Sequence, residues 1–342
     1  MAFNRPSRFF ILSNPRSTSN LFVRILNLKE QPNVAKHEQN GYFFLKASFL
    51  AKSLGTSEKN IREWTETERS AMRQAYQDAF NDMEEYLCEA ENNGKIAVVK
   101  EHCYMVLDPA FRSKFHFGQD GATENGWTLD LPAKYGDNPI KSEGNITLLP
   151  DAFLDTWNPI ILIRHPALMF PSFCRAMSDL FHINFKNLDI SLKRELNLAL
   201  SLTCARVIYD WYAKRLGKID GGKYQGESWP IVVDSDDVIN RPELMIKLAD
   251  MIGLDRDSLQ FTWEKEQTEN NGHPISTARE IMLSTLLSST GIISSRAATD
   301  IDIDIEANKW REEFGEEAGK YLEDCVKAAM PDYEFLKDKR LK

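Results

Sequence analysis

The sequence predicts an α/β fold in which helices flank a parallel β-sheet. Four short apolar runs have the length and residue types of buried strands. Helical patterns separate these runs, and this alternation is typical of a parallel sheet. The 342 residues are 42% hydrophobic and 27% charged, which suits a globular chain with a sizeable core. We expect one domain over residues 1–342.

The four strands are expected at residues 9–13, 96–100, 159–164 and 230–234. The last three are rich in Ile and Val, which favours buried positions in a sheet. Apolar residues at helical spacing predict helices at 58–92, 192–216, 242–252 and 306–329. We expect Gly253 to end the third helix and Pro331 to end the fourth. Residues 118–145 and 268–277 are expected to be irregular.

Composition excludes several classes of protein. The net charge of -9 argues against general binding to nucleic acid or to a membrane surface. The five cysteines are scattered, so neither a disulfide framework nor a zinc site is indicated. No apolar run is long enough to span a bilayer, and the first one is too short for a signal peptide. We therefore expect a cytoplasmic protein with no metal and no nucleic-acid or membrane partner; a homodimer remains open.

The first strand leads into a loop that suits an anion. Residues 14–20 read Asn-Pro-Arg-Ser-Thr-Ser-Asn and are followed by an amphipathic helix. Helix N-terminal amides and hydroxyl groups favour negative charge, and Arg16 adds a fixed positive charge. The same pattern also fits a plain turn capped by Ser or Thr. The triphosphate-binding pattern GxxxxGK[ST] is absent, and the loop has no glycine.

Two further strand ends carry functional side chains. The second strand ends near Lys100 and His102, and the third ends at Arg164, with Ser172 on the helix that follows. Ligands bind at the carboxyl ends of parallel strands. A histidine there can act as a general base, and an arginine can bind a phosphate with two nitrogens. The alternative interpretations are a structural histidine, a structural ion pair of Arg164 and a capping serine.

Taken together, these segments resemble the sulfotransferase family, which uses 3′-phosphoadenosine 5′-phosphosulfate (PAPS) on a P-loop-like α/β fold. Residues 15–20 are similar to the family's P-[KR]-S-G-T-[ST] loop, and residues 100–102 to its K-x-H pattern. Arg164, Pro166 and Ser172 match its R-x-P motif with a serine eight residues after the arginine. Residues 30–92 and 104–157 match no motif; in this family such regions shape the acceptor pocket.

The resemblance implies transfer of a sulfuryl group from PAPS to a hydroxyl or amine, with 3′,5′-adenosine bisphosphate as the product. It implies that His102 is the general base, that Lys100 acts at the transferring group, and that Arg16 offsets charge on the leaving oxygen. It further implies no metal, and it assigns the binding of the two phosphate groups to seven residues: Arg16, Ser17, Thr18, Ser19, Asn20, Arg164 and Ser172.

The chain departs from the family pattern at several positions. Thr18 stands at the usual glycine, so we expect non-glycine backbone geometry there. Leu21 and Ser235 stand where the family has a tryptophan and a tyrosine against the adenine. The C-terminal loop that binds the 3′-phosphate is not evident; Arg296 and the cluster 309–311 are candidate substitutes.

Three alternatives remain open from the sequence. A nucleotide-dependent kinase is disfavoured because the P-loop lysine pattern is absent and the third strand has no acidic residue at its tip for Mg²⁺. A sulfotransferase-like protein without PAPS could bind a small molecule, or catalyse a cyclisation or elimination. A purely structural protein is the third. The aromatic residues of the unmatched regions favour a small lipophilic acceptor.

Overall fold

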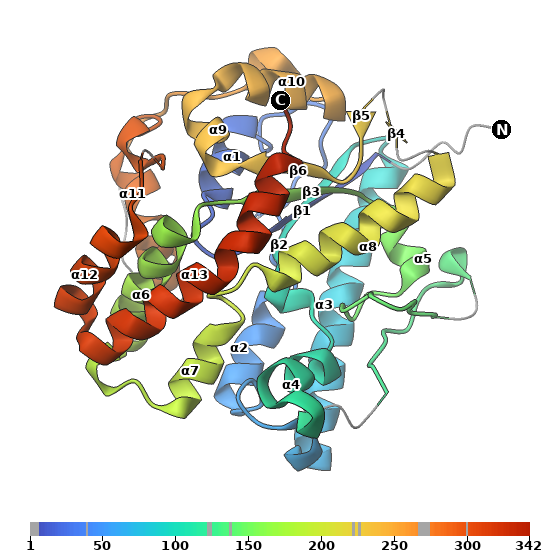
Figure 1. Ribbon diagram of the computed structural model, residues 1–342. Coiled ribbons are helices and arrows are strands. Elements are labelled where there is room, and N and C mark those ends of the chain that lie inside the picture. The colour runs from blue at the N-terminus through green and yellow to red at the C-terminus, as the bar shows by residue number, and fades with distance from the viewer. Residues whose placement is uncertain are drawn as a thin grey trace. The chain divides into compact units, whose positions relative to one another are not determined.

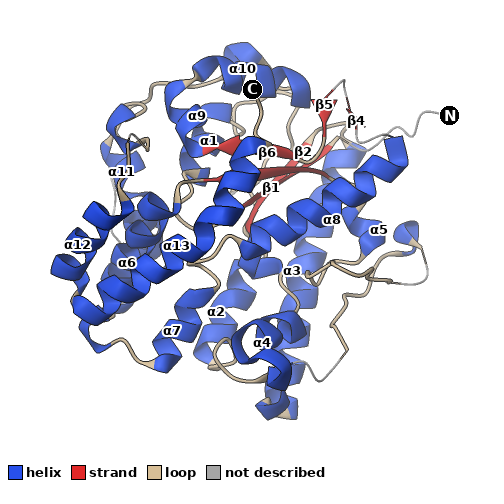
Figure 2. Cartoon of the chain, viewed as in Figure 1, coloured by secondary structure: helices blue, strands red, loops and turns tan. Residues whose placement is uncertain are grey.

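The computed structural model describes residues 7–38, 40–121, 125–136, 139–220, 223–224, 227–265, 274–298 and 300–342. Its central element is a four-stranded parallel sheet with the order β2-β1-β3-β6. The strands are β1 (Arg8–Ser13), β2 (Ala97–His102), β3 (Asn158–Ile163) and β6 (Ile231–Asp234). Figure 1 labels them, and Figure 2 draws them in red. The four predicted strands are confirmed.

The sheet owes its formation to a run of three or more apolar residues in each strand. All residues of β1, β2, β3 and β6 are buried, which explains why these strands read as continuous apolar runs with no alternation. The connection after β1 leads to β2 on one side, whereas β3 lies on the other side of β1. Such a change of direction marks the strand ends where ligands bind in open α/β sheets.

The chain divides into two compact units. Unit 1 comprises Met1–Ser13, Pro32–Ile161 and Thr203–Ile231, and unit 2 comprises Asn14–Gln31, Leu162–Leu202 and Val232–Lys342. The single-domain organisation over 1–342 stays a prediction.

Unit 1 contains β1, β2 and the longest helix, α3 (Glu66–Asn92). Thr65 caps α3, because its side chain accepts from the Glu68 amide while the Glu68 carboxylate accepts from the Thr65 amide. The other helices and short strands of the unit are α2 (Leu45–Ser53), α4 (Pro109–Phe117), α5 (Asp151–Leu154), α8 (Thr203–Asp220), β4 (Lys223–Tyr224) and β5 (Glu227–Ser228).

Unit 2 begins with α1 (Ser19–Leu26) directly after the loop. His165 caps α6 (Pro166–Phe181) by accepting from the Ala167 amide, and Pro166 occupies the first turn, where its missing N–H costs nothing. The remaining helices are α7 (Ile190–Asn197), α9 (Ser235–Asn240), α10 (Pro242–Ile252), α11 (Pro274–Ser288), α12 (Ile303–Phe314) and α13 (Glu316–Asp338).

Helix α10 and its end at Gly253 confirm the prediction, but three others were partly wrong. The helix expected at 58–92 begins at Glu66. The helix expected at 192–216 is two helices, because the intervening residues 198–202 form a turn whose residues are mostly buried, which kept the apolar pattern continuous. The helix expected at 306–329 is α12 and α13, separated at Gly315 with φ 93°.

Pro331 does not end a helix, since it lies inside α13. Residues 118–145 are irregular as expected, with only the 3₁₀ turns Gly118–Gly121 and Ala133–Tyr135 among their described residues. Of the loop expected at 268–277, residues 268–273 lie outside the described residues. Its last four residues are the start of α11.

Candidate active site

The loop after β1 is tightly folded on itself. The Asn14 carbonyl accepts from the Ser17 hydroxyl at 2.7 Å and from the Ser17 amide at 3.3 Å. The Asn14 side-chain amide donates to the Ser201 carbonyl at 2.7 Å. Ser17 and Ser19 are buried, and Ser19 opens α1. The loop therefore has a defined conformation and leads directly into the N-terminus of a helix. A fixed loop at a helix N-terminus is an arrangement that binds anions.

The backbone of Thr18 corrects one expectation. Thr18 has φ 64° and ψ 16°, which is the left-handed conformation that glycine adopts without strain. A β-branched residue is a true outlier there. Its hydroxyl lies 2.8 Å from the Ser235 hydroxyl, to which it donates. The glycine-type geometry is thus retained although the glycine is not, and Arg16 shares the positive φ at 66°.

Three arginines of unit 2 gather beside this loop. Arg16 donates through Nε to the Ser172 hydroxyl at 2.9 Å and through Nη1 to the Met282 carbonyl at 2.6 Å. Arg164 donates to the Arg16 carbonyl at 2.9 Å and to the Arg296 carbonyl at 3.1 Å. The predicted residues Arg16, Arg164 and Ser172 are therefore brought together.

The cluster carries concentrated positive charge. Burial and then the charge of Arg16 lower the pKa of Arg164 to about 10, although the carboxylates of Asp236 and Asp234 act in the opposite direction. Burial and the charge of Arg296 likewise lower the pKa of Arg16. Among the described residues, the hydrogen bonds of Arg16 and Arg164 go to neutral oxygens, and the buried Arg164 Nε has no hydrogen-bond partner. Because an unpaired buried donor is costly, this geometry suits an anionic ligand.

Of the two candidates for the missing C-terminal loop, the structure favours Arg296. The neighbouring Ala298 amide donates to the Asp236 carboxylate at 2.8 Å, which anchors the segment that carries Arg296. In the other candidate, Lys309 pairs with Glu306 at 2.5 Å. Trp310 is in the core, and Arg311 pairs with Glu323 and Glu316.

In unit 1, His102 ends β2 next to the end of β1. Ser13 and His102 are partners in the register of the two strands, and the Ser13 hydroxyl lies 3.0 Å from His102 Nδ1. The Tyr42 hydroxyl lies 3.2 Å from Nε2. Burial and then the charge of Lys100 lower the pKa of His102 to about 3. The imidazole is therefore neutral at physiological pH and has a lone pair that can accept a proton.

Lys100 lies two residues before His102 and thus shares its face of the strand. Its ammonium is 4.5 Å from the centre of the Tyr42 ring, a cation–π distance. Burial lowers the pKa of Lys100 to about 7, against the opposing charge of Glu101. Glu101 points to the other face, where its carboxylate accepts from the Phe44 amide at 3.3 Å.

Comparisons with known proteins support the same family. Sulfotransferase ppzF of Metarhizium rileyi (strain RCEF 4871) is 34% identical over 349 residues, with 99% of this chain and 97% of that protein covered. Sulfotransferase ppzF of Metarhizium majus (strain ARSEF 297) is 34% identical over 351 residues, with 99% and 98% covered.

The chain belongs to the sulfotransferase family. No family model matches the sequence. Among solved structures, the sulfotransferase domain from the Synechococcus PCC 7002 olefin synthase is 15% identical, with a TM-score of 0.39. That comparison covers 92% of this chain and 97% of the domain.

The structure of this sulfotransferase distributes the predicted residues over both units. Arg16, the loop 17–20, Arg164 and Ser172 are in unit 2, whereas Lys100 and His102 are in unit 1. Along the chain, Ser13, the partner of His102, precedes Arg16 by three positions. Two contacts of the imidazole, Ser13 and Tyr42, were not predicted as site residues. Tyr42 was predicted only as one of many aromatics, since no local pattern links it to His102.

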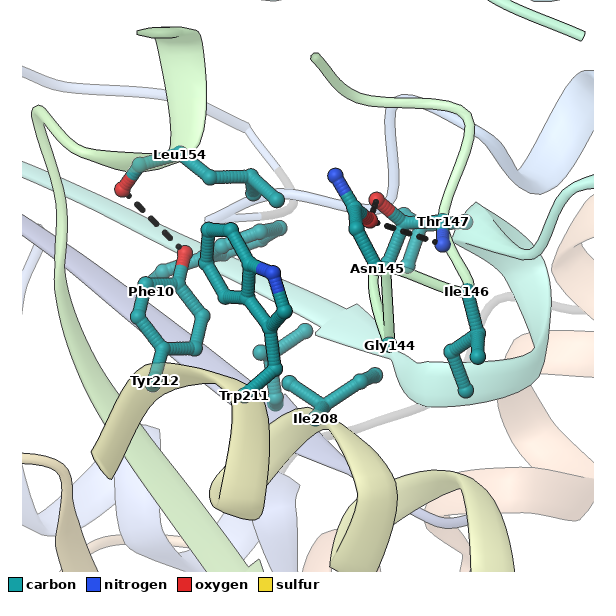
Figure 3. A pocket seen from close by; sticks show the side chains of 11 residues that line it. Phe10, Gly144, Asn145, Ile146, Thr147, Leu154, Ile208, Trp211 and Tyr212 are labelled. Carbon is teal, nitrogen blue, oxygen red and sulfur yellow. Dashed lines mark hydrogen bonds between the residues drawn. The ribbon is translucent and has the colours of Figure 1, made fainter. Parts of the chain in front are cut away.

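A small recess in unit 1 of this sulfotransferase contains none of the predicted site residues (Figure 3). It encloses about 270 Å³ including solvent at its mouth, below the usual range for ligand pockets. Trp211 of α8 borders it and donates to the Ser142 hydroxyl at 2.9 Å, and Tyr212 donates to the Leu154 carbonyl at 3.3 Å. We interpret the recess as a gap left where α8 packs against the loop at residues 144–147.

Within the described residues, no group of three or more His, Cys, Asp or Glu side chains is placed to hold a metal ion. No described helix combines the length and apolar character needed to cross a membrane.

Proposed function

We propose that this sulfotransferase moves a sulfuryl group from PAPS to a hydroxyl or amine of a small lipophilic acceptor. The observation that carries the proposal is the cluster of Arg16, Arg164 and Arg296. The charges of Arg16 and Arg296 lower the pKa of Arg164, so an anion placed beside these guanidinium groups would be stabilised, and both phosphate groups of the nucleotide are anions. The buried Arg164 Nε without a partner supplies an unused donor for it.

We propose a position for each of the two phosphate groups. PAPS supplies the activated sulfuryl group when bound. The amides of residues 17–20 and the Arg16 guanidinium hold the 5′-phosphate, because they lie at the helix N-terminus. Arg164, Ser172 and Arg296 hold the 3′-phosphate. Arg16 offsets the negative charge that develops on the leaving oxygen, which is electrostatic stabilisation as in phosphoryl transfer.

His102 acts as the general base in this proposal. The imidazole is neutral at physiological pH, so a ring nitrogen can accept a proton, and the Ser13 contact at Nδ1 fixes the ring. Lys100 stabilises charge on the transferring group from the same face of β2.

A repurposed protein that no longer uses PAPS is the second candidate. Leu21 and Ser235 supply no aromatic contact to an adenine ring, and Ser235 instead accepts a hydrogen bond from Thr18. That bond ties the loop to the start of α9. A function without PAPS predicts that adenosine bisphosphate leaves the melting temperature unchanged.

The test is transfer of label from [³⁵S]PAPS to a panel of phenols and aliphatic alcohols, including 2-naphthol and 1-octanol. We expect a labelled product with at least one of these acceptors, and a lower initial rate for Arg164→Ala at a PAPS concentration below the KM of the wild type. Absence of product from every acceptor, together with no thermal shift by adenosine bisphosphate, contradicts the proposal.

A further inference from the structure

Both ring nitrogens of His102 are engaged in unit 1. Nδ1 faces the Ser13 hydroxyl at 3.0 Å, and Nε2 faces the Tyr42 hydroxyl at 3.2 Å. A base that receives a proton directly from the acceptor needs one nitrogen open to that acceptor. In this geometry the Tyr42 hydroxyl occupies that position.

We assign the direction of donation from the neighbouring groups. The Ser13 hydroxyl also lies 3.5 Å from the Glu101 carbonyl, and as the donor there it leaves its oxygen to accept from Nδ1–H. The imidazole then carries its proton on Nδ1 and presents a lone pair on Nε2. Tyr42 donates its phenolic proton to this lone pair.

Tyr42 is held firmly against β2. The Tyr42 amide donates to the Lys100 carbonyl at 2.8 Å, and the Lys100 amide donates to the Asn40 carbonyl at 2.9 Å. Asn40, Gly41 and Tyr42 all have positive φ, at 52°, 128° and 59°. Such strained backbone persists only where the surroundings enforce it, and it clusters at functional sites.

The Lys100 ammonium holds the ring of Tyr42 as well. It lies 4.5 Å from the ring centre, and both groups are fixed to the same strand. In its protonated form, Lys100 at this place stabilises negative charge that develops on the phenolic oxygen. The backbone hydrogen bonds and the Lys100 contact make a rotation of Tyr42 away from His102 unfavourable. Proton transfer through the Tyr42 hydroxyl is then favoured.

We propose that Tyr42 is a catalytic residue that relays the acceptor proton to His102, an inference that rests on the proposed sulfuryl transfer. Tyr42 Oη accepts the proton of the acceptor hydroxyl and gives its own proton to His102 Nε2. The acceptor oxygen forms its bond to sulfur as the bond from sulfur to the bridging phosphate oxygen breaks. The electron pair of the broken bond leaves with the phosphate, and the proton on His102 later passes to solvent.

Tyr42→Phe tests the relay, because it keeps the ring under Lys100 and removes only the hydroxyl. With [³⁵S]PAPS and 2-naphthol, or 1-octanol if that is the better acceptor, we expect kcat to fall about 10-fold or more. The affinity for adenosine bisphosphate should be unchanged. Tyr209→Phe, a half-buried tyrosine of α8, is the control and should retain full kcat. Unchanged or increased kcat in Tyr42→Phe means that the hydroxyl blocks the base, and it overturns the relay.

A series of further variants distinguishes a role of the Tyr42 hydroxyl in proton transfer from a purely structural role. Fluorotyrosines placed at position 42 keep size and hydrogen bonding but lower the pKa of the phenol. A relay predicts that kcat follows this pKa across the series, whereas a structural hydroxyl predicts one common kcat. The series also covers the case in which Tyr42→Phe does not fold.

A third measurement, by NMR, does not depend on catalytic activity. In ¹⁵N spectra of the imidazole at pH 7.5, we expect the Nδ1–H tautomer of His102 and a change of the Nε2 signal in Tyr42→Phe. An Nε2 signal that does not change overturns the inference. If the wild type transfers no label to any acceptor, the proposed function fails, and the spectra then decide separately whether Tyr42 binds His102.

Discussion

At the scale of single residues, Arg164 carries the clearest prediction. Its guanidinium is buried beside Arg16, and its Nε has no partner among the described residues. Arg164→Ala should weaken the binding of 3′,5′-adenosine bisphosphate about 10-fold or more, since hydrogen bonds to charged groups contribute about 1.5–3 kcal/mol. Calorimetry measures this. Lys309→Ala, which removes a surface pair with Glu306, should bind normally; equal affinity of both variants contradicts the assignment.

His102 carries the second prediction at the scale of single residues. Removing a general base costs about 10²-fold or more in turnover, so His102→Ala should lower kcat by that factor with little effect on nucleotide affinity. His182→Asn is the matched control, because His182 is exposed at the end of α6 and asparagine tolerates its positive φ. Near-normal kcat in His102→Ala removes the imidazole from the mechanism.

Motif spacing predicted some of these residues and missed others for a physical reason. Arg16, Arg164 and Ser172 follow strands whose carboxyl ends can be read from apolar runs, and the structure brings the three together. Tyr42 is 60 positions from His102, and its contact depends on three residues with positive φ that no local pattern announces.

At the scale of elements, the segment before α2 depends on Gly41. A Cβ there would lie 2.1 Å from the Lys100 carbonyl oxygen, at φ +128°. Gly41→Ala should therefore lower the free energy of unfolding by about 3 kcal/mol or more, from the clash and the strained backbone. Gly55→Ala has φ +69° with no atom within 4 Å and should cost only about 1 kcal/mol. Urea unfolding measures both, and similar losses contradict the close packing of Gly41 on β2.

The N-terminus of α6 gives a pH-dependent prediction. Burial and then the charge of Lys337 lower the pKa of His165 to about 4. Between pH 6.5 and 4 the unfolded chain binds a proton that the native protein does not, so acidification destabilises the native state. Asparagine retains a cap but cannot titrate. Relative to the wild type, His165→Asn should gain about 1 kcal/mol between pH 7.5 and pH 5 in urea unfolding. If the free energy of unfolding changes equally with pH in the wild type and in His165→Asn, His165 is not buried in its neutral form.

Element prediction succeeded where one residue pattern decides the structure. The four strands are short and buried, and each contains a run of three or more apolar residues that identified it. The boundary between α7 and α8 was missed because most residues of the turn are buried and continue the apolar pattern. That turn also accepts the Asn14 amide at Ser201, a contact between segments 187 residues apart.

At the scale of the whole molecule, each unit holds a different set of the predicted site residues. Unit 2 gathers three cationic side chains around a helix N-terminus, and unit 1 holds a neutral imidazole with its hydroxyl partners. The net charge of -9 does not oppose this, because a few local cations decide the binding of a small anion. Family membership was predictable from the ordered motifs; the acceptor was not, since the unmatched segments follow no motif.

The most direct test of the account is calorimetric titration of the wild type at about 0.15 M ionic strength, with 3′,5′-adenosine bisphosphate and then with 5′-AMP. We predict a single site that binds the bisphosphate at least about 10-fold more tightly, because Arg164, Ser172 and Arg296 are proposed to hold the 3′-phosphate, which 5′-AMP lacks. No binding of the bisphosphate, or equal affinity for the two nucleotides, contradicts it.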